Sequence, residues 1–273
     1  MSIKTFLFLF VFALTAMAKE RIVSLSPSIT EIVYALGAGD ELVATSSYSL
    51  YPNAARKLPV IGGSTHPSIE KIISHSPTLV IGQSFNAQTL EKLKYFHIKR
   101  LKLKLKTIQD IKNSIIFLGK TISKTKEADR LLTDIITAIK NIKKTKKPHS
   151  VLIVYGLKEN LRSGIYVAGG NIFFDDIIKL TGNTNIYKDD TISQPVLNYE
   201  NIIALNPDQI IILHSHATEP NVNVKHALAN WYALPINAAK NGMISMVDED
   251  YLYIPSQRVA HTIKRLSREM YND

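Results

Sequence analysis

Apolar residues along this chain follow two spacings that alternate from beginning to end. Short runs of consecutive apolar or β-branched residues predict buried strands, and apolar residues three and four positions apart predict helices. By these patterns we expect strands over residues 21–25, 42–45, 99–105, 149–155 and 244–247, and helices over residues 29–36, 87–96, 175–180 and 258–270. Because strands and helices alternate, the pattern predicts an α/β protein with parallel sheets.

One segment of the chain occurs twice, at an offset of 130 residues. Residues 70–81 and 200–211 both begin with a glutamate, continue with paired isoleucines, and reach a proline before a second apolar run. Proline cannot continue a helix, so each copy predicts a short helix followed by a buried strand. Two copies are too few for a solenoid, which needs at least three. The repeat therefore predicts two equivalent lobes with a ligand cleft between them.

The middle of the chain, residues 107–147, contains one glycine and no proline. From Lys124 to Lys144 its apolar residues keep helical spacing for about six turns. Lysines near the end of this stretch favour the negative end of the helix dipole, and Pro148 ends it. We therefore expect a single long helix between an N-terminal lobe, residues 19–106, and a C-terminal lobe, residues 148–273.

The first 18 residues have the pattern of an export signal. Lys4 gives a positive start, residues 6–14 are apolar, and Ala16-Met17-Ala18 fits a cleavage site. The apolar stretch is too short to span a bilayer. The chain has no cysteine, which excludes a lipid anchor on cysteine and a disulfide scaffold. With 273 residues, 45% of them apolar, the sequence predicts an exported, core-forming protein of a bacterial periplasm.

The net charge of +10 comes mainly from residues 100–106 and 140–147. Leucines alternate with lysine or arginine over residues 100–106, which predicts a strand with one buried and one solvated face. Lysines on such a strand discourage edge pairing. Because no zinc-finger spacing or RNA-binding motif accompanies the charge, we expect a solvated surface and no nucleic-acid partner. We also expect a monomer.

Enzyme signatures are absent from the sequence. It contains no G-x-x-x-x-G-K-[ST], G-x-S-x-G or H-E-x-x-H motif, and Gly62-Gly63 and Gly169-Gly170 fit turns. We therefore do not expect an enzyme, although an exported enzyme of unknown type remains an alternative.

Polar and aromatic residues gather where the predicted strands end, which is where α/β proteins bind ligands. The glycine-rich loop before His66 would let a ligand approach the backbone. A different class of function, a free metal-ion receptor, would use His66, His214 and His216, but a metal site needs further ligands, and a solvated strand end is the favoured interpretation of the last two. The candidates from these positions are Tyr48, His66, His214, Tyr251, Tyr253 and Arg258.

Several stretches resemble the substrate-binding proteins of ABC importers for cobalamin, haem and ferric siderophores. The resemblance covers essentially the whole chain after the signal, and its first stretch is most similar to the cobalamin branch. It implies two Rossmann-like lobes joined by a single long α-helix, with the ligand held between them and little hinge closure. The stretches that carry it are RIVSLSPSITEI (21–32), SYSLYP (47–52), Gly62-Gly63, IEKI (69–72), AGGN (168–171), Asp175-Asp176 and PSQR (255–258).

The resemblance also implies roles for single residues. Glu70 and Glu200 match the acids that dock onto arginines of the two subunits of an inner-membrane permease. His66 and Gln194 stand where cobalamin binders carry tryptophan, which adds Gln194 to the ligand-binding candidates, while Tyr48 is kept. Tyr253 falls where some ferric-siderophore binders place a metal-ligating tyrosine.

From this resemblance we expect no catalytic cofactor and a transported metal chelate. The first expectation is a cobalamin-type corrinoid, and a ferric siderophore or haem is the alternative. His66 and Tyr253 are the candidate metal ligands, acting on the metal of the bound chelate; imidazole and phenolate oxygen both suit Fe(III) or cobalt.

Overall fold

The computed structural model describes residues 19–215 and 222–271. The predicted export signal and His216 lie outside the described residues. Within the described residues, no helix has the length and apolar character needed to cross a membrane.

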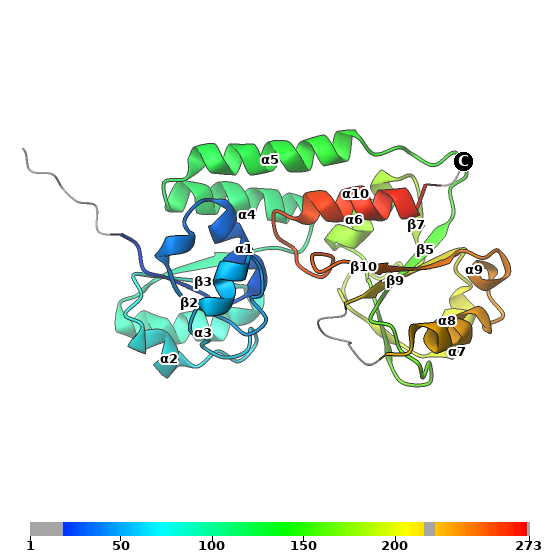
Figure 1. The fold of residues 1–273 in the computed structure, drawn as a ribbon, viewed down its shortest axis with the longest axis horizontal. Coiled ribbons are helices and arrows are strands. Elements are labelled where there is room, and N and C mark those ends of the chain that lie inside the picture. Colours follow the sequence, from blue (N-terminus) through cyan, green and yellow to red (C-terminus); the bar gives the residue numbers. More distant parts are fainter. Residues whose placement is uncertain (1–18, 216–221, 272–273) are drawn as a thin grey trace, which may run out of the picture.

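The N-terminal lobe is a parallel four-stranded sheet of order β2-β1-β3-β4 with helices on both faces (Figure 1). The edge strand β4 carries the alternating lysines and leucines, so the prediction of one buried and one solvated face is confirmed. The elements are β1 (Ile22–Ser24), α1 (Pro27–Ala35), β2 (Leu42–Thr45), α2 (Ile69–Ser74), β3 (Leu79–Gln83), α3 (Ala87–Lys92) and β4 (Lys99–Leu103). Short 3₁₀ helices cover Gly39–Glu41, Asn53–Lys57, Ser84–Asn86 and Leu93–Phe96.

The C-terminal lobe repeats this plan. Its parallel strands pair in the order β7-β5-β9-β10, and two short antiparallel strands, β6 and β8, extend the sheet beside β5. The elements are β5 (Ser150–Tyr155), β6 (Ile165–Val167), α6 (Phe173–Leu180), β7 (Thr184–Asn185), β8 (Val196–Leu197), α7 (Tyr199–Leu205), β9 (Gln209–His214), α8 (Val224–Tyr232), α9 (Asn237–Lys240), β10 (Ile244–Asp248) and α10 (Val259–Glu269).

The internal repeat seen in the sequence is a structural repeat. Helices α2 and α7 both begin one residue before the repeated glutamate, and strands β3 and β9 both begin two residues after the repeated proline. Side chains of Ser68 and Asn198 cap the two helices by accepting a hydrogen bond from a backbone N–H of the first turn. The prediction of helix, proline and strand is therefore confirmed in both lobes.

Two helices, rather than one, occupy the segment between the lobes. Helix α4 (Ile108–Thr121) turns back at Ser123, whose φ of 58° is left-handed, and α5 (Thr125–Lys140) then runs across both lobes (Figure 1). Gly119 lets the two helices pack closely, because a Cβ there would lie 2.6 Å from the Cβ of Ala128. Helix α5 is the long helix expected over residues 124–144, so that prediction is confirmed except at its C-terminal end.

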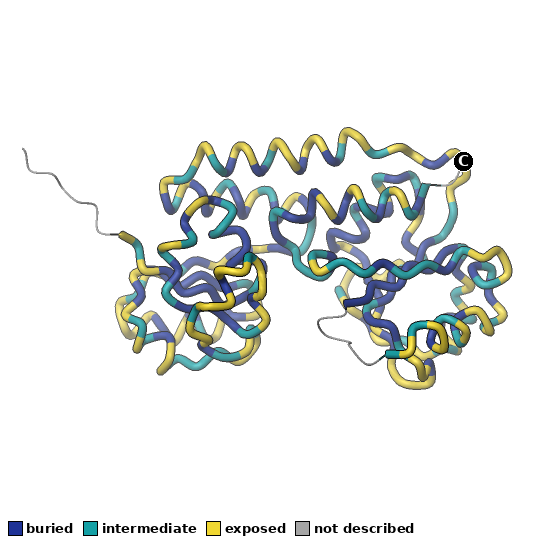
Figure 2. Tube along the Cα trace, in the orientation of Figure 1, coloured by how far each residue is buried: buried dark blue, intermediate teal, exposed yellow. Residues whose placement is uncertain are grey.

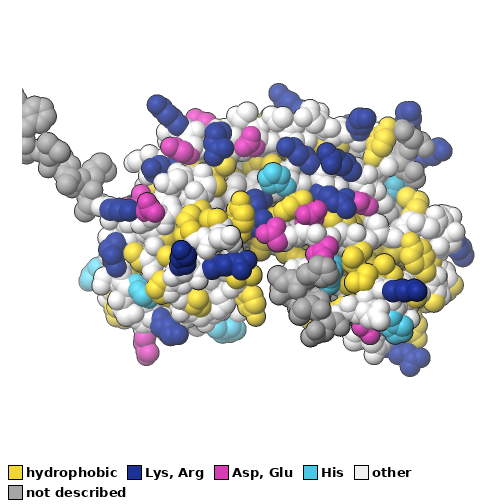
Figure 3. All heavy atoms as spheres, in the orientation of Figure 1, with side chains coloured by type: hydrophobic (Ala, Val, Ile, Leu, Met, Phe, Trp, Pro, Cys, Tyr) yellow, Lys and Arg dark blue, Asp and Glu magenta, His cyan; other side chains and the backbone are white. Residues whose placement is uncertain are grey.

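Helix α5 ends at Lys140, one turn earlier than predicted. Lys140, Lys143, Lys144 and Lys147 would lie three and four positions apart on one face of a longer helix, where like charges repel. Lys and Arg side chains are spread over the side of the molecule that α5 and α10 form (Figure 3).

A continuous apolar core joins the two lobes. The largest buried cluster includes residues of β1, β3 and β4 in one lobe, β5, β9 and β10 in the other, and of the helices α1, α4, α5, α6 and α10. Smaller clusters lie beneath α2 and α3 in the first lobe and beneath α7 and α8 in the second. Figure 2 shows the buried strands inside each lobe and the exposed outer side of α5. The shared cluster fixes the two lobes relative to each other.

Candidate functional site

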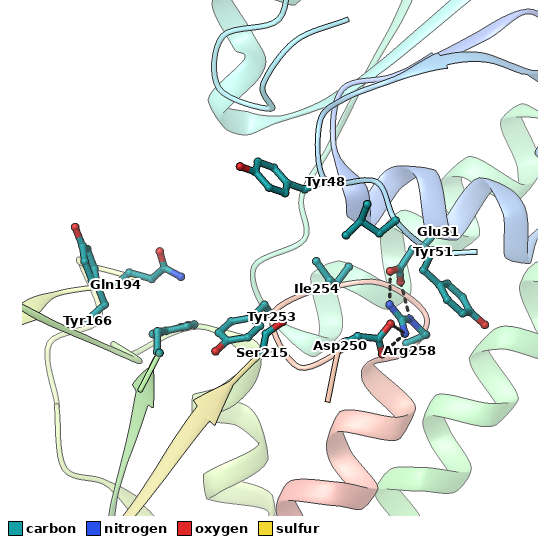
Figure 4. Close-up of a pocket in the computed structure, with 13 residues that line it drawn as sticks. Glu31, Tyr48, Tyr51, Tyr166, Gln194, Ser215, Asp250, Tyr253, Ile254 and Arg258 are labelled. Carbon is teal, nitrogen blue, oxygen red and sulfur yellow. Dashed lines mark hydrogen bonds and ion pairs between the residues drawn. The ribbon is translucent and has the colours of Figure 1, made fainter. Parts of the chain in front are cut away.

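Two adjoining cavities lie between the lobes. The first, of about 360 Å³, is lined by residues of the loop after β2 and of the C-terminal lobe (Figure 4). The second, of about 950 Å³, lies beside it at the ends of β3 and β4. Both cavities share Tyr155, Gln194, Tyr253 and Ile254, so together they form one cleft.

The N-terminal wall of the first cavity is a loop that projects Tyr48 and Tyr51. Tyr48 is 75% exposed and has a φ of 64°, an unusual conformation that turns its ring away from the lobe and toward the cleft. Buried hydroxyl groups hold the base of this loop: Thr45 Oγ1 lies 2.5 Å from Thr30 Oγ1 and donates to Ser49 Oγ at 2.8 Å. These buried hydrogen bonds therefore hold the loop that carries the two exposed tyrosine rings.

The C-terminal wall is a small aromatic stack. The Tyr155 and Tyr253 rings are stacked, with centroids 6.0 Å apart, and the Tyr155 and Phe174 rings form a T-shaped pair with centroids 5.6 Å apart. The hydroxyl of Tyr253 donates to the carbonyl of Leu213 at 2.7 Å. Burial raises the pKa of Tyr155 to about 12, against a hydrogen bond with the Gln194 side chain that lowers it. Tyr155 therefore stays neutral at physiological pH.

A buried ion pair closes one end of the first cavity and joins the lobes. Arg258 Nε donates to Glu31 Oε2 at 3.0 Å, and Nη2 donates to the other oxygen of the same carboxylate. The third nitrogen, Nη1, donates to both oxygens of Asp250 at 2.8 and 2.9 Å. The guanidinium carbon lies 3.9 Å from the centroid of the Tyr51 ring. Burial raises the pKa of Glu31, and the hydrogen bonds from Arg258 and Ser256 oppose that rise.

The structure brings together four of the predicted ligand-binding residues. Tyr48, Gln194, Tyr253 and Arg258 all line the first cavity. Tyr251 lies outside the lining of both cavities and contacts Arg258 instead, with its ring centroid 5.7 Å from the guanidinium carbon.

The predicted histidines are separated from the cleft lining. His66 is exposed, with its Nδ1 2.9 Å from Thr65 Oγ1, and its loop is closed by a backbone bridge between Gly62 and Pro67. His214 is 1% exposed at the end of β9, and the next residue, Ser215, lines the cavity in its place. Among the described residues no group of three or more His, Asp or Glu is placed to hold a metal ion.

Sequence reasoning missed several residues of the cleft. Glu31 lies within the apolar run of α1, where nothing in the pattern separates it from a solvated helix acid. Its burial follows from the distant Arg258, a partner 227 positions away. Tyr155 is the last residue of β5, so the rule that selected Tyr48 would have found it, whereas Tyr166 is the middle residue of the short strand β6 and falls outside that rule.

The paired glutamates occupy equivalent places outside the cleft. Glu70 is the second residue of α2 and Glu200 is the second residue of α7, and both are exposed. The two helices lie on the side of the molecule opposite α5, one in each lobe (Figure 1). The molecule therefore presents two matched negative charges on one side.

A two-lobed α/β chain with an interlobe cleft is the architecture of a known protein family, and residues 22–251 match the family model for periplasmic binding proteins. The chain belongs to this family. Its relatives include a vitamin B12-binding protein of Vibrio parahaemolyticus, 30% identical over 250 residues that cover 89% of this chain and 86% of the relative.

Solved structures of periplasmic binding proteins share the fold. The haem-binding protein RhuT of Roseiflexus sp. RS-1 superposes with a TM-score of 0.75 at 26% identity, covering 93% of this chain and 98% of that one. The vitamin B12-binding protein BtuF of Vibrio cholerae gives a TM-score of 0.72 at 25% identity, covering 92% and 96%. The expected class of two-lobed binding protein is confirmed.

Proposed function

We propose that this protein is a periplasmic substrate-binding protein that delivers a metal chelate, a cobalamin-type corrinoid, to an inner-membrane ABC importer. The observation that carries the proposal is the interlobe cleft with tyrosines on both walls. Tyr48 and Tyr51 come from one lobe and Tyr155, Tyr166 and Tyr253 from the other.

The lining of the cleft suits a broad, largely apolar ligand with polar edges. Aromatic rings provide large contact area with few rotatable bonds, and their hydroxyls provide hydrogen bonds. Gln194 adds an amide to the lining of both cavities. A corrin ring, which is flat and edged with amides, matches these groups, and vitamin B12-binding relatives support this choice.

The importer as partner rests on Glu70 and Glu200. Each acid is exposed, and each occupies the same position in its half of the internal repeat. A permease with two equivalent subunits presents two equivalent surfaces, so matched charges on the two lobes would engage both subunits at once.

Haem is the second candidate, and the geometry of Tyr48 favours it over a free metal ion. Among the described residues the Tyr48 hydroxyl has no hydrogen-bond partner, whereas that of Tyr253 is bonded to a backbone carbonyl. A tyrosine oxygen can serve as an axial ligand of ferric haem. We therefore propose Tyr48, ahead of His66 and Tyr253, as the side chain that would meet a chelated iron.

The test is a binding titration with cyanocobalamin and haemin, followed by visible absorbance of the chelate. Trp231 is a fully buried residue of α8 and lines neither cavity, so its fluorescence is a poor reporter. Tyr48→Ala should weaken binding by more than about tenfold, since it removes a large contact surface. Tyr95→Ala is the matched control, because Tyr95 is 81% exposed and lines neither cavity. Equal effects of the two substitutions would contradict the proposal.

A further inference from the structure

The N-terminus of α1 lies at the second cavity, and Ser28 is in the first turn of this helix. Ser28 is 3% exposed and lines the cavity. Among the described residues its hydroxyl has no hydrogen-bond partner. Its backbone N–H lies in the first turn of the helix, where no intrahelical acceptor exists.

The neighbouring polar groups at this helix end are already paired, which isolates Ser28. The Ser26 hydroxyl accepts hydrogen bonds from the Ile29 backbone N–H and from Gln83 Nε2 at 2.8 Å. The Thr30 hydroxyl is bonded within the buried hydroxyl cluster. Ser28, a lining residue of the cavity, thus has a hydroxyl and a backbone N–H without a partner among the described residues, at the positive end of a nine-residue helix.

Two lysines line the same cavity. Lys104 is exposed and Lys106 is partly buried, and neither amine forms an ion pair among the described residues. Their backbones are fixed, since the carbonyl of Lys104 accepts from Ser114 Oγ and that of Lys106 accepts from the Phe173 N–H at 2.8 Å.

The one acid that lines this cavity offsets only one of the two positive charges, and it forms no ion pair with either lysine among the described residues. This acid is Asp110, and its carboxylate accepts a hydrogen bond from the Thr107 backbone N–H at 3.2 Å in the cap of α4. The cavity therefore combines two unpaired amines with unsatisfied donors at a helix N-terminus.

We propose that the second cavity binds an anionic oxygen group carried by the chelate, a carboxylate or a phosphodiester. Ser28 donates to this group, and Lys104 and Lys106 supply the countercharge. The inference rests on the proposed function and adds to it a substrate class: the chelate has an anionic arm, which occupies the second cavity while its ring lies against the tyrosines of the first.

The test compares chelates that differ in the anionic group. Haemin is paired with haemin dimethyl ester, and cyanocobalamin with dicyanocobinamide, which lacks the phosphodiester. We expect the wild-type protein to bind haemin more tightly than its dimethyl ester, or cyanocobalamin more tightly than dicyanocobinamide, whichever pair it binds. Ser28→Ala should weaken binding of the anionic chelate by about tenfold and leave binding of the other member unchanged, since hydrogen bonds to charged groups are the strong ones.

Lys102, on the strand β4 that precedes these two lysines, provides a control. Lys104→Gln and Lys106→Gln should each weaken binding of the anionic chelate by up to about fivefold, and the effect should be smaller at high salt. Lys102→Gln, on exposed Lys102 outside both cavities, should change nothing. If both members bind equally and no variant separates them, the anionic subsite is wrong while the proposed function stands. If none of the four chelates binds the wild type, the proposed function fails and the subsite with it.

Discussion

Arg258 of the C-terminal lobe and Glu31 of the N-terminal lobe form a two-point hydrogen-bonded ion pair across the cleft. Their side chains are 9% and 3% exposed. A charge so deeply buried is costly to leave alone, so the pair holds the lobes at one spacing and in one orientation. The sequence motif PSQR is therefore a joint between lobes as well as a part of the cleft wall.

Removing one partner of this pair should be strongly destabilising. We expect Arg258→Ala to lower the free energy of unfolding by about 3–5 kcal/mol, because Glu31 would be left buried without its countercharge. Arg265→Ala is the control, since Arg265 pairs with Glu269 on the partly exposed surface of α10 and such pairs contribute about 1 kcal/mol or less. Urea unfolding of the two variants measures the difference in unfolding free energy. Similar losses in both variants would show that the interlobe pair contributes no more to stability than the surface pair.

Charge reversal at Glu70 and Glu200 should abolish transport and leave chelate affinity unchanged. Both acids lie outside the cleft, and each lost contact at a buried, hydrogen-bonded interface costs about 2–5 kcal/mol. Uptake by cells and binding to purified protein separate the two effects. The control is reversal of Asp129 and Asp134, exposed acids on α5, on the opposite side of the molecule. A fall in affinity that matches the fall in uptake would place the glutamates in the ligand site.

The lobes should move little when a chelate binds. Helix α5 crosses both lobes without proline or glycine, the largest apolar cluster is continuous between them, and Arg258 bridges to Glu31. We expect the radius of gyration from solution scattering to be the same with and without bound chelate, within error. A clear decrease on binding would reveal hinge closure.

Stability should fall at high pH because of Tyr155. Its pKa is about 12 in the folded protein, against 10 for the free side chain, so the folded state holds the proton more tightly. This contribution is complete below pH 10 and is lost as the pH rises through 12. Between pH 9 and pH 11 the wild type should therefore lose about 1 kcal/mol more unfolding free energy than Tyr155→Phe. Parallel urea titrations of both proteins at the two pH values test this, and equal losses would refute it.

The fold was largely predictable because its signals are local. The repeated glutamate, proline and apolar run mark α2, β3, α7 and β9 through capping and proline chemistry, which act within a few residues. The end of α5 at Lys140 was predicted one turn too late, because the apolar spacing continues to Ile142 and the repulsion among the lysines that follow was given less weight. The short strands β6 and β8, of three and two residues, carry no pattern of their own: β6 depends on pairing with β5, and β8 on pairing with β6.

The site was predictable where residues follow strands and unpredictable where they meet across lobes. Tyr48, Tyr253 and Arg258 follow from the position of ligands at strand ends. Glu31 becomes part of the site only because Arg258 of the second lobe pairs with it. His66 lies in a glycine-rich loop bridged between Gly62 and Pro67, and Ser64 of that loop lines the second cavity while His66 lines neither.

The position of the metal in a crystal of the chelate complex tests the central claim most directly. Anomalous scattering from cobalt or iron locates the metal independently of the rest of the ligand. We predict one strong peak in the interlobe cleft, between Tyr48 of the N-terminal lobe and the Tyr155–Tyr253 stack of the C-terminal lobe. A peak at His66 or elsewhere on the surface, with the cleft empty, would contradict the account.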